Sequence, residues 1–167
     1  MIHLPSSRLI ALYFLVSFAA LSAFAVPVRA DEEPILDIKI VENDLGIQTW
    51  LVEDHNLPIV VLRFEFLNAG ASTDTKELQG LARMASNTMD EGAADLDSRT
   101  FQKLLQDNSI SLGFSASRDN FGGSLQTLSS NKELAFDLLY KALNEPRFDQ
   151  EAIDRMRDAN IARIRSS

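Results

Sequence analysis

The chain has 167 residues, of which 46% are hydrophobic and 24% are charged. This balance is typical of a globular protein with one domain, or at most two small ones, and argues against a disordered or fibrous chain. The absence of cysteine excludes disulfide bonds, thiolate zinc sites and a cysteine nucleophile. The net charge of −8 argues against nucleic-acid binding, because neutralising phosphates requires an excess of basic residues.

The first residues have the pattern of a secretory signal peptide. An uncharged apolar run extends from Leu9 to Phe24, Arg8 stands directly before it, and small residues at positions 28 and 30 precede a cleavage point. A positive start, an apolar middle and a small-residue exit are typical of such signals. We therefore predict a signal peptide over residues 1–30.

Two alternatives to this interpretation stay open. Ala23–Ala25 offers a second cleavage point, and the uncharged stretch Leu9–Val28 is long enough to remain as an uncleaved membrane anchor. With cleavage after residue 30, residues 31–167 form the mature domain. An exported chain without cysteine fits a bacterial periplasm, where disulfide bonds are optional. We therefore expect a periplasmic protein, anchored to the membrane if the segment stays uncleaved.

The mature chain begins with three predicted β-strands. Residues 35–41 and 47–52 flank the turn-forming segment Asn43–Gly46, and the strongest strand pattern covers residues 57–67. In the third strand apolar and charged side chains alternate, which is typical of a strand with one buried face. Because short polar turns join the three strands, we expect an antiparallel meander of two hairpins.

Helical periodicity then replaces alternation. Asp74 resembles a helix cap, apolar residues recur at helical spacing over residues 78–89, and Gly92 is a suitable C-terminal stop. A second helix begins at Asp97 or Ser98 and buries Phe101, Leu104 and Leu105. Two strands and two helices follow, at residues 111–117, 121–128, 131–145 and 149–164.

The predicted order of elements is β-β-β-α-α-β-β-α-α. This order indicates an α+β fold, in which an antiparallel sheet carries helices packed on one face. The last helix is still in phase where the sequence stops at Ser167. We therefore expect a domain that is truncated at its C-terminus.

Few side chains of this chain suit catalysis. The two histidines are His3 and His55, whereas a zinc site takes about four His, Cys, Asp or Glu ligands. After signal removal His55 remains, in a polar turn. The sequence has neither a Gly-x-Ser-x-Gly motif nor a P-loop. The residues therefore predict no metal site and no catalytic residue.

Two other features allow two interpretations each. Acidic residues cluster at positions 90–91 and 95–97, and helix capping explains them better than calcium binding, because the alternating oxygen ligands and fixed glycine of a calcium loop are missing. Gly122 and Gly123 lie inside a predicted strand. A β-bulge explains this pair better than a close backbone approach.

Short segments spread along the chain match a known family in their order and spacing. They are Gly46–Asp54, Pro58–Val60, Phe66–Ala71, Gln79–Ala82, Glu91–Ala93, Phe101, Phe114–Asp119 and Glu145–Phe148. Through them, residues 35–167 resemble the N-terminal domain of the insulinase/pitrilysin-type metallopeptidases, the inverzincins. The resemblance implies a domain like those of pitrilysin and the mitochondrial processing peptidase.

The sequence departs from this family where zinc is bound. In catalytic members a His-x-x-Glu-His motif follows the Gly-Leu-Ala segment, with two zinc-binding histidines and a glutamate as general base. The corresponding residues here are Arg83, Ser86 and Asn87, and Arg163 falls at or next to the third ligand, a glutamate in the family. Arginine stays protonated and does not ligate zinc. The comparison therefore implies the family's scaffold without its zinc and without another cofactor.

Many members of this family work in pairs, in which one subunit carries zinc and the other is degenerate. The resemblance implies a catalytically inactive subunit or fragment that supports peptide or protein processing by a zinc-carrying partner. In this family the substrate adds as a strand to a sheet edge, and the matching residues are Phe114, Ser115 and Ala116. Two alternatives stay open: a zinc-dependent endopeptidase with an atypical metal site, and a stand-alone periplasmic module that binds peptides.

Overall fold

The computed structural model describes residues 36–166, so the predicted signal peptide lies outside the described residues. The chain divides into two compact units, with the boundary between Glu53 and Asp54. Within the described part, no helix combines the length and the apolar character that crossing a bilayer requires.

The smaller unit contains a β-hairpin. Its strands β1 (Ile38–Glu42) and β2 (Gln48–Val52) pair antiparallel. The side chain of Asn43 closes the turn, because its Oδ1 accepts hydrogen bonds from the backbone N–H groups of Leu45 (3.0 Å) and Ile47 (2.9 Å). The predicted turn is therefore confirmed.

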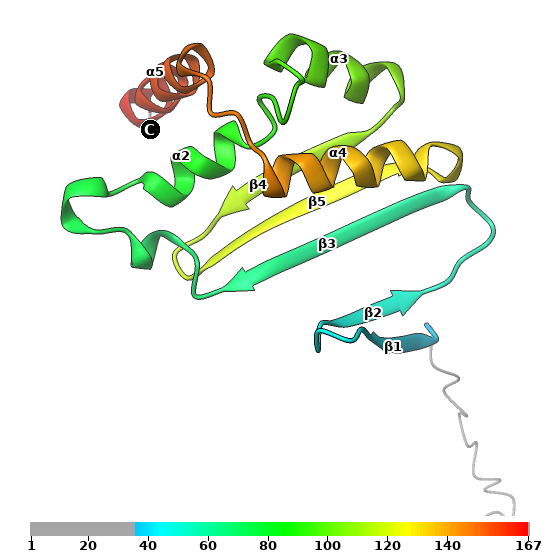
Figure 1. The fold of residues 1–167 in the computed structure, drawn as a ribbon. Coiled ribbons are helices and arrows are strands. Elements are labelled where there is room, and N and C mark those ends of the chain that lie inside the picture. The colour runs from blue at the N-terminus through cyan, green and yellow to red at the C-terminus, as the bar shows by residue number, and fades with distance from the viewer. Residues whose placement is uncertain (1–35, 167) are drawn as a thin grey trace, which may run out of the picture. The chain divides into compact units, whose positions relative to one another are not determined.

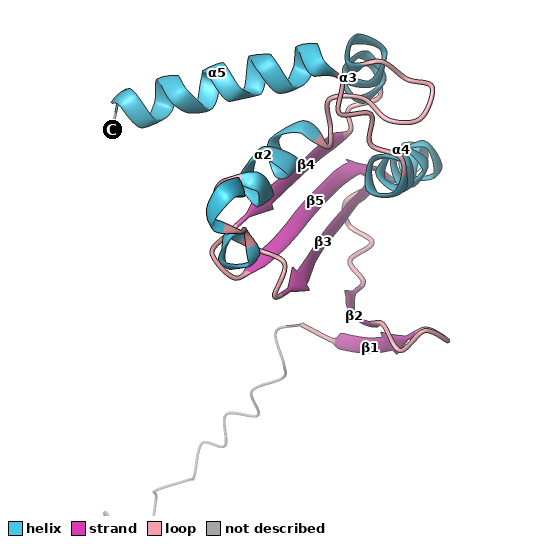
Figure 2. Cartoon of the chain, turned by 60° about the vertical axis from the view of Figure 1, so that its left-hand side comes forward, coloured by secondary structure: helices cyan, strands magenta, loops and turns pink. Residues whose placement is uncertain are grey.

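The larger unit is a three-stranded antiparallel sheet with helices on one face (Figure 1). Its strands are β3 (Ile59–Leu67), β4 (Ser111–Ala116) and β5 (Asn120–Leu128), in the order β3-β5-β4. Its helices are α2 (Leu81–Thr88), α3 (Ser98–Asp107), α4 (Lys132–Asn144) and α5 (Gln150–Ser166), with 3-10 turns at Ala71–Thr73, Lys76–Leu78 and Ser129–Asn131. A second view shows the same two layers (Figure 2). The predicted α+β class and order of elements are confirmed.

One predicted strand pairing is wrong. Strand β3 pairs with β5 over its full length, instead of continuing a meander from the preceding strand. In the β3–β5 pair Phe64 stands opposite Gly123, and a Cβ at that glycine would lie 2.6 Å from Phe64 Cζ, so this pairing needs the glycine. The ladder runs through Gly122 and Gly123 without interruption, so the bulge interpretation is also wrong. These glycines allow close approach instead.

The helix predicted after Asp74 starts later than expected. Asp74 does cap it, because its carboxylate accepts hydrogen bonds from the N–H groups of Gly80 (2.8 Å) and Ala82 (3.1 Å). However, Gly80 has a φ of 95°, which is outside the helical region, and α2 begins only at Leu81. A short 3-10 turn occupies the segment that periodicity assigned to the first helical turn.

The hydrophobic core lies between the sheet and its helices. Phe101 and Leu105 of α3 and Leu138 of α4 pack in one cluster with Leu112 and Leu125 of the sheet. Phe101, Leu125 and Leu138 are 0% exposed, and burying a side chain of this size contributes about 1.5–3 kcal/mol. Since Leu112 belongs to β4, the core fixes the strand that carries the predicted substrate-binding residues.

Candidate functional site

Strand β4 is an outer strand of the three-stranded sheet. One of its edges pairs with β5, and within residues 36–166 no strand pairs with the other edge. An outer edge presents backbone N–H and C=O groups that an added strand can use. Phe114, Ser115 and Ala116, the predicted substrate-binding residues, all lie in this strand.

Two of these three residues are packed partly into the protein. Ser115 is exposed, whereas Phe114 and Ala116 are half-buried. The ring of Phe114 lies 6.3 Å from the ring of Phe64 and 6.3 Å from that of Phe121, measured between centroids. Ring pairs at this distance stabilise their arrangement beyond simple burial. The strand is therefore well fixed, and its binding of substrate stays a prediction.

A close backbone contact fixes the turn after β4. Gly70 N–H donates to the carbonyl of Asp119 (3.2 Å), and Ala71 N–H donates to the carbonyl of Ser117 (3.0 Å). A Cβ at Gly70 would lie 2.5 Å from the backbone nitrogen of Asn120, so only glycine fits there. This contact holds the segment around Gly70 against the turn after β4.

Helix α2 packs beside β4 and carries the residues that replace the zinc motif. Arg83 is exposed, Ser86 is buried and Asn87 is half-buried. The Ser86 hydroxyl donates to the carbonyl of Arg83 over 2.9 Å, so it is engaged within its own helix. A guanidinium, a hydroxyl and an amide supply neither the imidazole ligands nor the carboxylate base of a zinc peptidase.

The residue that faces this motif from α5 is Asn160. Asn87 Nδ2 donates to Asn160 Oδ1 over 3.0 Å and thereby joins the two helices. Two ligands of one tetrahedral zinc, each about 2.0–2.1 Å from the metal, lie about 3.3 Å apart. The two positions are therefore close enough for their side chains to meet at one point, although the chemistry of two amides does not fit zinc.

Asn160 makes a side-chain hydrogen bond to the motif helix. Arg163, which the resemblance placed at or next to the third ligand, is exposed and lies three residues further along α5. Sequence reasoning missed Asn160, although a signal was present. Asn160 is a polar residue in register with Ile153 and Met156, on the stripe of the last helix that turns toward the protein.

Other candidate ligands do not form a metal site. Within residues 36–166, no three or more His, Asp or Glu side chains come together in a group that could hold a metal ion. His55 is exposed in the connection between β2 and β3.

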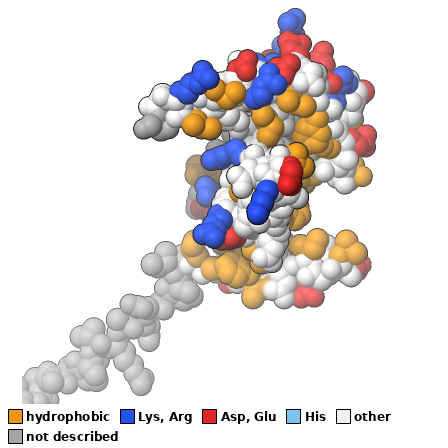
Figure 3. Space-filling view, turned by 90° about the vertical axis from the view of Figure 1, so that its left-hand side faces the viewer, with side chains coloured by type: hydrophobic (Ala, Val, Ile, Leu, Met, Phe, Trp, Pro, Cys, Tyr) orange, Lys and Arg blue, Asp and Glu red, His pale blue; other side chains and the backbone are white. Residues whose placement is uncertain are grey.

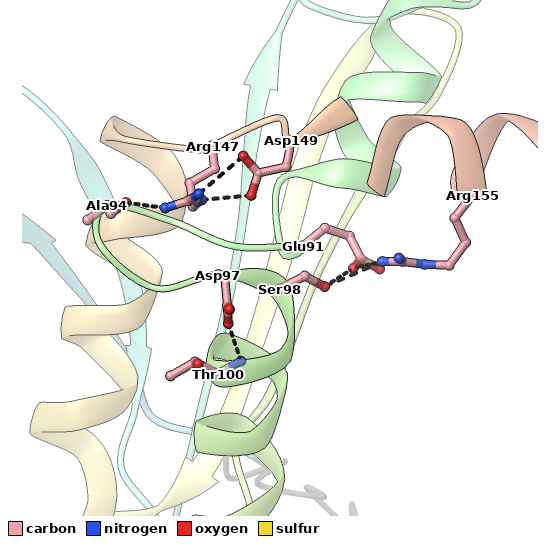
Figure 4. A network of polar contacts seen from close by, with 8 residues as sticks. All are labelled: Glu91, Ala94, Asp97, Ser98, Thr100, Arg147, Asp149 and Arg155. Atoms are coloured by element: carbon pink, nitrogen blue, oxygen red, sulfur yellow. Dashed lines mark hydrogen bonds and ion pairs between the residues drawn. The ribbon is translucent and has the colours of Figure 1, made fainter. Parts of the chain in front are cut away.

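The acidic cluster after α2 serves helix capping and ion pairing (Figure 4). Glu91 accepts a hydrogen bond from the Ser98 hydroxyl (2.6 Å) and pairs with Arg155 of α5. Asp97 caps α3 by accepting from Thr100 N–H (2.8 Å), and hydrogen bonds from the side chain and backbone of Thr100 lower the pKa of Asp97. The capping interpretation is confirmed for this residue.

Asp90 differs from its acidic neighbours. Burial raises its pKa to about 6, with a smaller contribution from the charge of Glu91. A separate surface hollow of about 350 Å³ is lined by residues at the starts of α3 and α5. It contains both acidic and basic side chains and none from α2 or β4, so it does not extend the candidate site.

The family model described as insulinase (Peptidase family M16) matches residues 62–166. The chain belongs to this family. Its curated relative in Helicobacter pylori, "Non-peptidase homolog YmxG", is 28% identical over 122 residues, which cover 73% of this chain and 28% of that protein. The chain therefore spans less than a third of this relative.

Solved structures agree with this assignment. The structure of a peptidase M16 inactive domain from Pseudomonas fluorescens is 25% identical, has a TM-score of 0.68, and the match covers 76% of this chain and 31% of that one. Pitrilysin has a TM-score of 0.65 at 21% identity, covering 80% of this chain and 14% of its own, and confirms the fold. With Arg83, Ser86 and Asn87 at the motif positions, this chain is a homologue of the insulinase-family peptidases that lacks their zinc-binding motif.

Proposed function

We propose that this chain is a non-catalytic insulinase-family subunit that supports peptide or protein processing by a zinc-carrying partner of the same family. One observation carries the proposal: the zinc-motif positions hold Arg83, Ser86 and Asn87 beside a strand, β4, that has an outer edge. Of these residues, Asn87 is hydrogen-bonded to Asn160 of α5 over 3.0 Å. The proposal assigns substrate binding to this chain and bond cleavage to the partner.

In this role, β4 holds an extended segment of a peptide or unfolded protein. Backbone hydrogen bonds at a strand edge tolerate many sequences, because they do not involve the side chains of the peptide. Phe114 and Ala116 are fixed by the core side of the sheet and Ser115 is exposed, which suits a preformed edge. The proposal includes export to the periplasm by residues 1–30.

Mixing the full chain with a zinc-carrying insulinase-family peptidase from the same organism tests this function. Light scattering after size exclusion should show a stoichiometric complex, and kcat/KM for an extended peptide should rise severalfold when this chain is added. The matched control is the same peptide with N-methylated backbone amides, which cannot pair with a strand edge and should gain nothing. Chelator-sensitive cleavage by this chain alone would refute the non-catalytic role.

The outer position of β4 also favours a second candidate, a stand-alone peptide-binding module. This candidate predicts binding of the unmethylated peptide without any partner. It further predicts no complex with the family peptidase and an unchanged kcat/KM. The same mixing experiment therefore separates the two candidates.

A further inference from the structure

The contact between α2 and α5 places two arginines on the same side of an amide pair. The helices run in opposite directions (Figures 1 and 2), and Asn87 joins Asn160 where they meet. Arg83 lies four residues before Asn87, and Arg163 lies three residues after Asn160. Residues three or four apart share one face of a helix. Both arginines therefore lie one turn from the amide pair, in the same direction.

The charge at this end of the molecule is opposite to that of the whole chain. The sequence has 24 acidic and 16 basic residues, yet Lys and Arg side chains gather on the face that carries the end of α5 and α2 (Figure 3). Arg83 is exposed and forms no ion pair with any carboxylate of the described residues. Its guanidinium is available to an external anion.

We propose that the surface site formed by Arg83, Asn87, Asn160 and Arg163 where α2 meets α5, called the notch below, binds a carboxylate of the peptide that lies on β4. This inference rests on the proposed function, because it needs a peptide at the strand beside α2. Guanidinium groups bind carboxylates through paired, charge-assisted hydrogen bonds, and each asparagine amide has N–H donors. The substrate class is therefore an extended peptide with either a free C-terminus or an acidic side chain at this point.

Three peptides of one extended sequence distinguish the sources of the carboxylate. The first has a free C-terminal carboxylate, the second has a C-terminal amide, and the third has the amide together with one glutamate near its end. Fluorescence anisotropy with the full chain should show that the first or the third binds about five- to tenfold more tightly than the second. The ratio should shrink as salt is raised, because exposed charges are screened.

Variants of the protein assign this preference to the notch. Arg83→Gln should reduce the ratio of dissociation constants to about one while the amidated peptide still binds. The matched control is Arg99→Gln, which removes an exposed arginine of α3 and should leave the ratio unchanged. Circular dichroism verifies that both variants are folded.

The outcomes separate this inference from the proposed function. Equal binding of all three peptides by the unmodified chain would overturn carboxylate recognition and leave strand binding in place. Absence of binding by all three, including the amidated peptide, would overturn both. A preference that survives Arg83→Gln and Arg163→Gln together would show that the carboxylate binds elsewhere, and the assignment to the notch would be wrong.

Discussion

The contact between Asn87 and Asn160 predicts how a metal site could be rebuilt in this chain. We expect the triple variant Arg83→His/Asn87→His/Asn160→Glu to bind zinc, because it places two imidazoles on α2 and one carboxylate on α5. Ser86 stays unchanged, since it is 1% exposed and a glutamate there would be buried without a partner.

The geometry sets the size of the expected effect. The 3.0 Å hydrogen bond between Asn87 and Asn160 shows that side chains at these two positions reach one another, as two ligands of one zinc must. Arg163 lies a turn further along and is exposed. Moving the glutamate from position 160 to 163 should weaken zinc binding at least about tenfold, as loss of correct ligand placement does.

Thermal unfolding in the presence of zinc measures this difference. At a zinc concentration about 100 times its Kd, the variant with Asn160→Glu should gain about 2.7 kcal/mol, and one that binds tenfold more weakly should gain about 1.4 kcal/mol. The comparison variant is Arg83→His/Asn87→His/Arg163→Glu, which also removes a positive charge and so has an electrostatic advantage. Tighter zinc binding by the comparison variant would refute the placement of Asn160 as the third position.

Four further predictions follow from other parts of the structure. Gly123→Ala should destabilise the fold by about 1–3 kcal/mol, because its Cβ would lie 2.6 Å from the Phe64 ring, whereas Gly113→Ala, with nothing within 4 Å, should change the urea midpoint little. Phe101→Ala should cost about 3–5 kcal/mol in the same assay, since its side chain is 0% exposed. The pKa of Asp90, raised to about 6 from 3.8, means that the folded state favours the protonated form. Stability should therefore fall as pH rises from about 4 to about 6, and Asp90→Asn should flatten that decline. Metal analysis after dialysis should find no stoichiometric zinc in the unmodified chain.

Local patterns predicted most of the fold, because they report which face of each element is buried. Alternation placed β4 at residues 111–117, and the strand is Ser111–Ala116. The pairing of β3 could not be predicted in the same way. It depends on Phe64 fitting over Gly123, a contact between residues that are far apart in the sequence.

The loss of the zinc motif could be predicted from sequence, whereas the residue opposite it could not. The replacements at positions 83, 86 and 87 are visible in a single window of α2. Which residue of α5 lies opposite the motif depends on the point at which α5 crosses α2. An error of three residues in that point moves the assignment by about one helical turn. Asn160 and Arg163 differ by that step, and the 3.0 Å contact shows that Asn160 is the residue hydrogen-bonded to Asn87.

The substitutions that remove zinc chemistry also reverse the charge preference of the notch. Zinc favours neutral imidazoles and carboxylates around a cation, whereas Arg83 and Arg163 bring two positive charges to the same junction and exclude a cation from it. The Asn87–Asn160 hydrogen bond keeps a direct link between α2 and α5, at a net contribution of about 1 kcal/mol. Glu91 and Arg155 hold α5 nearer its start. Arg83 and Asn87 thus both stand at zinc-motif positions and belong to the proposed carboxylate site, while the Asn87–Asn160 and Glu91–Arg155 contacts hold α5 in place.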